Sequence, residues 1–481
     1  MFWRGVVGYL PVNVVQGLVG LATIVTFTRL LSPEQYGAYA LGFSVMALAH
    51  TALFTWNEAA MARFWAVEAE KAAAPHHLAT VYRTWLALIV LLPFAGLAVA
   101  LWPMAAGVKL AVLAGLACIL PRTLAKLVQE RRRAAGEVAS AALLDIGLTL
   151  GGFAVGAGLA FAGLGGAAPL MGAGAATAVC LAFVLPAELR GAKGGRFDRE
   201  RSKAHAAYGV PVALSLILAL VLSTTDRFLI AAFLDESAVG AYHAGYSLSN
   251  RTLDVLFIWL GAAGGPALIM ALERGGQDAL RKAAHEQASL IVLVTLPAAV
   301  GLALTARPLA DIMVGEALRD GAAQVTPWIA ASGVFAGLTT YYFAQAFTLA
   351  RRTRLLLIAM AIPAVANVAL NLILIPRLGL TGALVATLAS YGLGAVAACG
   401  LGRRVLPLPI PWIALGQAAL GAALMALAVV SLPALGGLAE LALKAGVGAV
   451  VYGMVVYLLN AGGLRSRGRS ALGALRARAT A

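Results

Sequence analysis

The chain alternates between long apolar runs and short polar segments along its whole length. A helix needs about 20 mainly apolar residues to cross the hydrocarbon of a bilayer. Runs of that length predict an all-α, polytopic membrane protein with about 14 transmembrane helices, or about 12 if the last pair of runs does not cross. The predicted crossings lie near residues 5–28, 37–62, 82–102, 108–128, 138–162, 168–188, 207–233, 238–268, 287–306, 324–349, 355–375, 380–401, 411–432 and 441–462.

One helix-to-helix junction is written twice, half a chain apart. The first copy, TRLLSPEQYGAYALGFS, spans residues 28–44, and the second, AAFLDESAVGAYHAGYS, spans residues 231–247. In register, Gly37-Ala38-Tyr39 aligns with Gly240-Ala241-Tyr242. The repeat is either a chance match in a chain rich in Ala and Gly, or the mark of a transporter built from two similar halves.

A second, weaker repeat supports the two-half interpretation. Residues 144–150 and 163–167 resemble residues 366–372 and 379–383, in the same order and at a similar offset. We therefore expect two pseudo-symmetric six-helix bundles followed by two more helices. The expected domains are a first bundle (1–189), a basic cytoplasmic linker (190–206), a second bundle (207–404), two additional transmembrane helices (405–463) and a basic cytoplasmic tail (464–481).

The composition agrees with a lipid environment. Hydrophobic residues make up 61% of the chain and charged residues only 12%, whereas a soluble protein carries about 25%. The formal charge of +15 does not indicate nucleic-acid binding, because the cations cluster in the short segments between apolar runs. With the N-terminus inside, 28 of the 36 lysines and arginines lie on inside segments. The positive-inside rule therefore predicts that both termini are cytoplasmic.

A few polar residues lie within the predicted crossings, where a charge costs about 2.5–3.5 kcal/mol on insertion scales. Arg251 is the deepest, with Asn250 beside it and Asp254 at i+3 on the same helix face. Two readings stay open. Arg251 and Asp254 neutralise each other in a polar seam between helices, or Arg251 faces an anionic substrate, whose phosphate oxygens a guanidinium binds bidentately.

The other polar residues within the crossings divide into amides and carboxylates. They are Asn13, Gln16, Asn57, Glu58, Asn367, Asn371, Asp145 and Asp226, the last of which lies near the outer end of its crossing. Amide side chains either hold helices together or contact a hydroxyl-rich substrate such as a sugar. Asp145 lies deep enough to be costly if ionised, which makes it a candidate site for coupling to a proton or sodium gradient.

Catalytic and metal-binding patterns are absent from the sequence. His76-His77 has no Cys or carboxylate partner at ligand spacing, and the three cysteines have no paired spacing. The Gly-rich run 163–177 lacks the Lys-Ser/Thr of a phosphate loop. No nucleophile is paired with a base. We therefore expect a protein that is not an enzyme and that holds no metal and no cofactor.

Three segments together resemble a known family. They are Asn13, Gln16 and Gly17 with TRLLSPEQYGAY (28–39), then TDRFLIAAFLDESAVGAYHAGYSL (225–248), and ANVALNLILIPRLGLTGALVAT (366–387). The chain resembles the bacterial polysaccharide (oligosaccharide-lipid) flippases of the multidrug/oligosaccharidyl-lipid/polysaccharide exporter (MOP) superfamily. The segments occur in the family's order with crossings between them, and they cover most of the chain.

The resemblance implies two bundles around a central, V-shaped cavity that opens alternately to each face. The implied cargo is a polyprenyl-pyrophosphate-linked oligosaccharide, moved from the inner to the outer leaflet of the bacterial cytoplasmic (inner) membrane. It implies that Arg251 holds the pyrophosphate, and that an ion gradient or the membrane potential drives transport. Membrane lipids and the pathway's polymerase and glycosyltransferases are the implied partners. An ion-coupled multidrug or metabolite antiporter of the same superfamily, a membrane-embedded polysaccharide polymerase or ligase, and an assembly scaffold are the alternatives.

Overall fold

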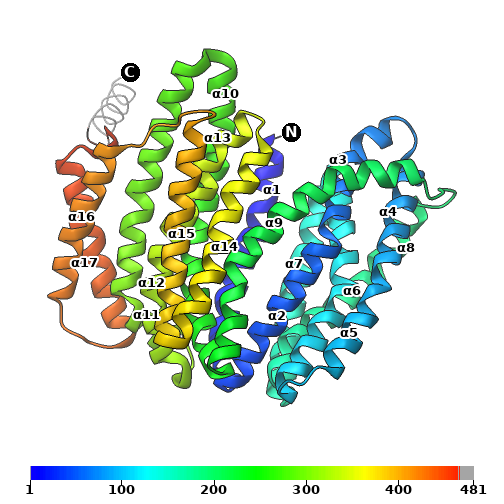
Figure 1. Ribbon diagram of the computed structural model, residues 1–481, viewed down its shortest axis with the longest axis horizontal. Coiled ribbons are helices and arrows are strands. Elements are labelled where there is room, and N and C mark those ends of the chain that lie inside the picture. Colours follow the sequence, from blue (N-terminus) through cyan, green and yellow to red (C-terminus); the bar gives the residue numbers. More distant parts are fainter. Residues whose placement is uncertain (1, 464, 466–481) are drawn as a thin grey trace, which may run out of the picture. The chain divides into compact units, whose positions relative to one another are not determined.

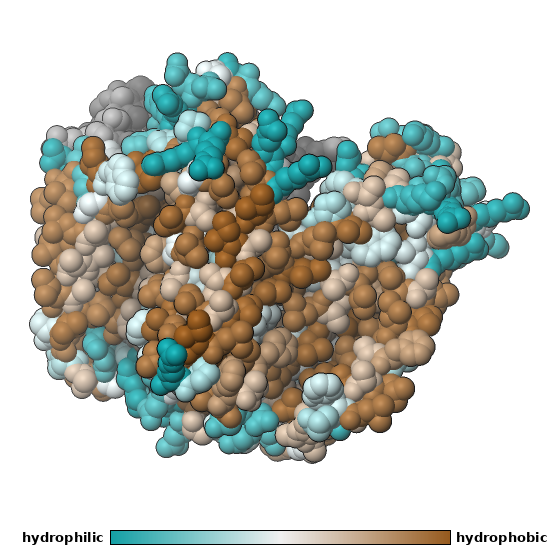
Figure 2. Space-filling model, in the orientation of Figure 1, coloured by the Kyte–Doolittle hydropathy of each residue, from teal (hydrophilic) through white to brown (hydrophobic). Residues whose placement is uncertain are grey.

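The computed structural model describes residues 2–463 and residue 465, and every regular element in that part of the chain is a helix. Eleven of these helices are long and apolar enough to cross a membrane, or twelve if one bent pair counts as a single crossing. In Figure 2 apolar surface covers the middle stretch of the helices, and polar residues gather at their ends. The expected all-α, multi-pass membrane protein is therefore confirmed.

Contacts divide the chain into two compact units, Met1–His243 and Ala244–Ala481. The first unit holds α1 to α9 and the beginning of α10 (Figure 1). Its helices are α1 (Phe2–Leu30), α2 (Pro33–Leu53), α3 (Thr55–Glu70), α4 (Ala74–Ile89), α5 (Leu91–Leu101), α6 (Ala106–Ala134), α7 (Val138–Phe161), α8 (Ala168–Gly191) and α9 (Arg199–Phe233). α7 packs against both α1 and α8, and α6 packs against α2 and α8.

The second unit contains the rest of α10 and the helices that follow it. They are α10 (Glu236–Leu304), α11 (Ala306–Met313), α12 (Arg319–Leu338), α13 (Ala344–Leu349), α14 (Thr353–Leu378), α15 (Leu380–Arg403), α16 (Trp412–Val430) and α17 (Gly437–Leu458). In Figure 1 α16 and α17 lie side by side, as their contacts require. The largest apolar cluster of this unit is built on Leu253, Phe257 and Ile291 of α10 and Tyr342 of the segment before α13.

The unit boundary differs in position from the predicted linker. It falls inside α10, whereas the sequence repeats divide the chain at 190–206. The reason is that α9, which follows the linker, packs on α3 and α2 of the first unit. The division into bundles 1–189 and 207–404 therefore stays a prediction about sequence symmetry. The predicted tail lies outside the described residues except for Arg465.

Both copies of the repeated junction form the same local structure, a helix end followed directly by a capped helix start. In the first copy the Ser32 side chain accepts a hydrogen bond from the backbone N–H of Gln35 at 3.3 Å. The Gln35 side chain accepts one from the backbone N–H of Ser32 at 3.1 Å, which completes a capping box. In the second copy the Asp235 side chain accepts from the N–H of Ala238 at 2.7 Å. Each polar turn therefore satisfies backbone donors that a helix start leaves unpaired.

The two copies of the junction also contact each other through their glycines. A Cβ added at Gly37 would overlap the carbonyl oxygen of Glu236, and one added at Gly240 would overlap the carbonyl oxygen of Pro33. The starts of α2 and α10 thus approach with backbone against backbone. This is the close contact that small residues permit between membrane helices. It gives a physical reason for the glycine at both equivalent positions of the repeat.

Helix α10 is two helices joined at a kink. It runs for 69 residues, but Gly276 has φ 65° and ψ −154°, a backbone conformation that other residues rarely adopt. The two crossings predicted at 238–268 and 287–306 lie on either side of this glycine. The predicted crossing at 37–62 contains the bend of 50° between α2 and α3.

A π-helical turn, Thr339–Phe343, joins α12 to α13 within the crossing predicted at 324–349. A π-turn inserts one extra residue into the helix and frees a backbone carbonyl. Here the Gln287 side chain of α10 donates a hydrogen bond to the Tyr341 carbonyl at 3.3 Å. The Phe257 and Tyr341 rings stack beside it, with centroids 5.7 Å apart. Two side chains of α10 therefore support the irregular turn.

We expect Gly37→Ala to destabilise the protein, because the added methyl group must displace backbone rather than a flexible side chain. Overpacking of this kind costs about 1–3 kcal/mol. The measurement is the midpoint of thermal unfolding of the detergent-solubilised protein. Gly400→Ala is the matched control, since nothing lies within 4 Å of a Cβ at Gly400. Equal midpoints for both variants would contradict the close backbone contact.

Candidate functional site

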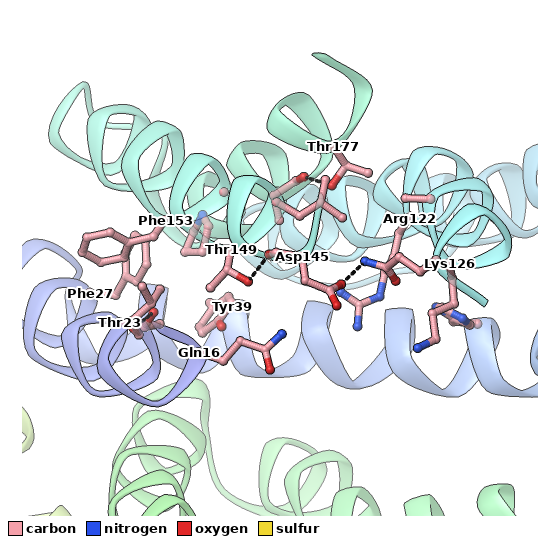
Figure 3. Close-up of a pocket in the computed structure, with 18 of the residues that line it drawn as sticks. Gln16, Thr23, Phe27, Tyr39, Arg122, Lys126, Asp145, Thr149, Phe153 and Thr177 are labelled. Atoms are coloured by element: carbon pink, nitrogen blue, oxygen red, sulfur yellow. Dashed lines mark hydrogen bonds between the residues drawn. The ribbon is translucent and has the colours of Figure 1, made fainter. Parts of the chain in front are cut away.

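A pocket of about 410 Å³ opens within the first unit, between α1, α2, α6, α7 and α8. Polar side chains line it, although the helices around it are mainly apolar. In Figure 3 Arg122 and Lys126 lie at one end of the pocket, Phe27 and Phe153 at the other, and Asp145 between them. Such a polar pocket among membrane-spanning helices is the natural candidate for a binding site.

Helix α6 supplies the charged wall. Its residues Arg122, Lys126, Gln129 and Arg133 are spaced by four, three and four residues, so they share one helix face. Three of them are cations. The only carboxylate that lines the pocket in the described residues is Asp145 of α7. The lining therefore carries an excess of positive charge.

Asp145 is held by two residues of α6. Its side chain is 4% exposed. One carboxylate oxygen receives a hydrogen bond from Arg133 Nη2 at 2.7 Å, and the other receives one from the Gln129 side chain. Arg133 also contacts Glu130 at 3.1 Å. A buried charge is tolerated only when it is paired and hydrogen-bonded, and both oxygens of Asp145 meet that condition.

The two other cations are less constrained. Lys126 forms an ion pair with Glu130 at 2.9 Å near the pocket edge, where both side chains are partly exposed. Arg122 is exposed to the pocket and makes no ion pair with any described residue. An exposed pair of this kind contributes about 0–1 kcal/mol, so it would yield readily to a ligand. Arg122 and Lys126 are therefore the groups best able to bind an anion here.

Hydroxyl and amide groups form the rest of the polar lining. Thr23, Thr149 and Thr177 each donate to the carbonyl four residues earlier in their own helix, at 2.6–2.7 Å. Their hydroxyl protons are thus used, which leaves oxygen lone pairs as acceptors on the pocket wall. Gln16 adds an exposed amide from α1. These groups suit a ligand that presents hydroxyl donors.

Aromatic rings close the other end of the pocket. Phe27 contacts the rings of Phe153 and Tyr39, each with centroids 6.2 Å apart. His50 of α2 also lines the pocket, and its Nε2 lies 2.8 Å from a carboxylate oxygen of Glu58, which is itself buried. The pocket therefore combines cationic, hydroxyl-accepting and aromatic surfaces within a few helical turns.

Of the site residues predicted in the first half of the chain, some line the pocket and others do not. Gln16 and Asp145 line the pocket. Asn13 lies one turn before Gln16 on α1 and is exposed. Glu58 contacts His50, which lines the pocket. Asn57 is buried and donates to the Val81 carbonyl at 3.1 Å, which is a contact between helices.

The residues predicted for the second half belong to the second unit. The Asn250 side chain donates to the Asp254 carboxylate at 2.7 Å. Arg251 is exposed, and it makes no ion pair within 4.0 Å among the described residues. Asn367 and Asn371 are both 0% exposed, and Asn371 donates to the Asn367 carbonyl at 2.9 Å. The binding roles predicted for these residues stay predictions.

Of the residues that line the pocket, the sequence predicts Gln16 and Asp145; those it misses include the α6 wall, Arg122, Lys126, Gln129 and Arg133. The positive-inside rule counts the three cations among them as charges of a cytoplasmic segment. Their spacing of four, three and four residues on an apolar helix was the signal that could have found them, since it places all four on one face. His50 was missed as well, because a lone histidine has no such signal.

The bundle of membrane-spanning helices with a polar pocket has the fold of MOP-superfamily transporters. The family described as "Polysaccharide biosynthesis protein" matches residues 26–321. The chain belongs to this family, which confirms the resemblance inferred from the sequence. No curated protein matches the chain.

Solved structures share the fold at low sequence identity. One is "Lipid II flippase MurJ, inward closed conformation", at 13% identity and a TM-score of 0.75, covering 94% of this chain and 98% of that one. Another is an inward-facing multidrug resistance MATE transporter of the MOP superfamily, at 17% identity and a TM-score of 0.64, covering 81% and 94%. A third is a MOP transporter from Pyrococcus furiosus with a binding pocket of reverse polarity, at 16% and 0.55, covering 83% and 92%. These identities establish the fold alone.

We expect Asp145 and Arg133 to be energetically coupled. Asp145→Asn and Arg133→Gln should each lower the free energy of unfolding, and the double variant should lose less than the sum, by about 0.5–3 kcal/mol. The measurement is a double-mutant cycle on the detergent-solubilised protein. The matched control is Lys126→Gln with Glu130→Gln, where the coupling should stay below about 1 kcal/mol. Additive losses at Asp145 and Arg133 would argue against the buried pair.

Proposed function

We propose that this protein is a flippase that moves a polyprenyl-pyrophosphate-linked oligosaccharide from the inner to the outer leaflet of the bacterial cytoplasmic membrane by alternating access. The pocket of the first unit is the observation that carries the proposal. It places an excess of cations beside hydroxyl acceptors and aromatic rings. Family membership agrees, because such lipid-linked sugars are intermediates of polysaccharide biosynthesis.

The pyrophosphate of the cargo would bind at the α6 wall. Arg122 and Lys126 offer a guanidinium and an ammonium with no buried carboxylate as partner. Guanidinium binds phosphate oxygens with two parallel hydrogen bonds, and a charged hydrogen bond of this kind contributes about 1.5–3 kcal/mol. The polyprenyl chain remains in the bilayer. Only the charged and sugar-bearing head has to leave water.

The first sugars would lie between the α6 wall and the rings. The oxygens of Thr23, Thr149 and Thr177 accept sugar hydroxyl protons, and Gln16 both donates and accepts. The volume of about 410 Å³ is within the usual range for small-ligand sites. It suits the pyrophosphate and the nearest sugars rather than a whole repeat unit.

Asp145 would couple transport to an ion gradient through Arg133. A proton on Asp145 removes one of the carboxylate charges paired with Arg133, which weakens the hold on the guanidinium and lets it shift toward the cargo phosphates while its contact with Glu130 remains. A proton needs no coordination sites, whereas Arg133 and Gln129 already occupy both oxygens that a sodium ion would use. We therefore favour proton coupling over sodium coupling.

The remaining predictions complete the proposal. We propose 14 crossings with both termini in the cytoplasm, since α10 provides two crossings and the segment from α12 to α13 provides one. In the second unit, Arg251, Asn250, Asp254, Asn367 and Asn371 are proposed to contact cargo during the cycle. Asn13, Asn57 and Glu58 are proposed to do so from the first unit. The pathway's polymerase and glycosyltransferases are the proposed partners.

An antiporter for cationic drugs is the second candidate, because MATE transporters share the fold. The lining of the pocket favours the flippase. Three cations and one paired carboxylate would repel a cationic drug and attract a phosphate ester.

We expect Arg122→Ala to weaken cargo binding about 10- to 100-fold, the equivalent of one charged hydrogen bond. Translocation of a fluorescent polyprenyl-pyrophosphate oligosaccharide is measured in proteoliposomes. Arg199→Ala, at an exposed cation outside the pocket, is the matched control. Unchanged translocation by Arg122→Ala would remove Arg122 from the mechanism. If Arg122→Ala instead loses drug export and still translocates the sugar-lipid, the result would favour the antiporter.

We also expect Arg251→Ala to abolish glycan export without loss of membrane insertion, because the variant removes a proposed phosphate-binding cation. Export is measured as surface polysaccharide in cells that carry the variant as their sole copy. Protein level in the membrane fraction is the control. Normal export at equal protein level would exclude Arg251 from the mechanism.

A further inference from the structure

A second pocket lies at one end of the first unit, apart from the pocket described above. Its walls are the early part of α4, the end of α8 and the loop that follows α8, and its volume is about 420 Å³. Figure 1 places the beginning of α4 and the end of α8 at the same end of this unit. In the orientation that the charges predict, this end faces the cytoplasm.

Three cations line this second pocket without a carboxylate beside them. They are Arg83 of α4, Arg190 of α8 and Lys193 of the following loop, and all three are exposed. Arg190 Nε donates to the Pro186 carbonyl at 3.2 Å, which leaves its terminal nitrogens for a ligand. In the part of the chain that the structure describes, none of the three forms an ion pair.

Nearby carboxylates are already engaged with other arginines. Glu188, which lies between the lining residues Pro186 and Leu189 of α8, is shared by Arg131 and Arg132 at 2.7 and 2.8 Å. Glu68 of α3 pairs with Arg201 at 3.1 Å. The carboxylates of Glu188 and Glu68 are therefore paired with other arginines, and no carboxylate among the lining residues balances the positive charge of the second pocket.

Apolar side chains continue from these cations along both helices. Leu86 of α4 and Val90, the residue directly after α4, follow Arg83 at i+3 and i+7, and they are 60% and 57% exposed. On α8, Phe183 precedes Arg190 by seven residues on the same face and is 81% exposed. Because α4 begins and α8 ends at the pocket, both apolar stripes run from the cations in the same direction, into the predicted membrane.

A ligand that satisfies both features has an anionic head and hydrocarbon chains. We infer that an anionic phospholipid of the cytoplasmic leaflet binds here, with its phosphate among Arg83, Arg190 and Lys193 and its acyl chains along Leu86 and Phe183. Free phosphate would leave the apolar stripes unused. The bound lipid bridges α4 to the end of α8 and to the loop that leads to α9. This inference does not depend on the proposed cargo.

The test is lipid binding by the full-length protein in detergent, measured by native mass spectrometry with phosphatidylglycerol as the probe. Each cation near an anionic membrane surface contributes about fivefold to binding. We therefore expect the triple variant Arg83→Gln, Arg190→Gln, Lys193→Gln to bind at least tenfold more weakly. All three residues are exposed, so folding should survive, and the thermal midpoint checks this.

The matched control removes the same charge from three exposed cations of the first unit that do not line the second pocket, as Arg63→Gln, Lys71→Gln, Arg199→Gln. This control should bind phosphatidylglycerol as the unmodified protein does. An equal loss in both triple variants would show diffuse attraction and overturn the site. Equal binding of phosphatidylcholine, or displacement of the lipid by millimolar inorganic phosphate, would also overturn it.

Discussion

The fold depends on the contact between the two copies of the repeated junction. The starts of α2 and α10 approach so closely that neither Gly37 nor Gly240 could carry a Cβ. Lipid offers little hydrophobic drive between helices, so packing at short range has to hold them. The polar turns before both helices cap their own backbone, which lets these ends meet without leaving donors unpaired. Tyr36, which precedes Gly37, and Tyr242, two residues after Gly240, are both fully buried.

In the pocket of the first unit, too, buried polar groups have hydrogen-bonding or ionic partners. In the part of the pocket that the structure describes, the buried carboxylate of Asp145 has two partners from the same helix. The pairing weakens as exposure rises, from the buried Asp145 to the partly exposed Lys126 and then to the exposed Arg122. This gradient separates a structural role from a binding role. The groups whose charges are least compensated are those that a cargo can reach.

The sequence was most informative where a pattern repeats over many residues. Hydrophobic length placed the helices, and the Gly-Ala-Tyr repeat located the contact on which they depend. The sequence was least informative where one side chain decides between two roles. Asn57 holds a neighbouring helix, whereas Gln16 faces the pocket, and the two amides look alike in the chain. The binding role of Arg122 and Lys126 could not be recognised from the sequence, because the positive-inside rule already explains cations at these positions. The bend at Phe54 and the π-turn have no local sequence signal of comparable strength.

The π-turn at Thr339–Phe343 changes the direction in which the residues after it point. The extra residue rotates everything after it by about 100° relative to an uninterrupted α-helix. A helical wheel drawn through α12 and α13 without this turn would therefore place the residues of α13 about 100° away from their true direction. Gln287 caps the freed carbonyl from α10, so the offset is stabilised by a neighbour rather than by the segment itself. Relatives that lack one residue in this segment would present the same buried face with a regular helix and no glutamine opposite.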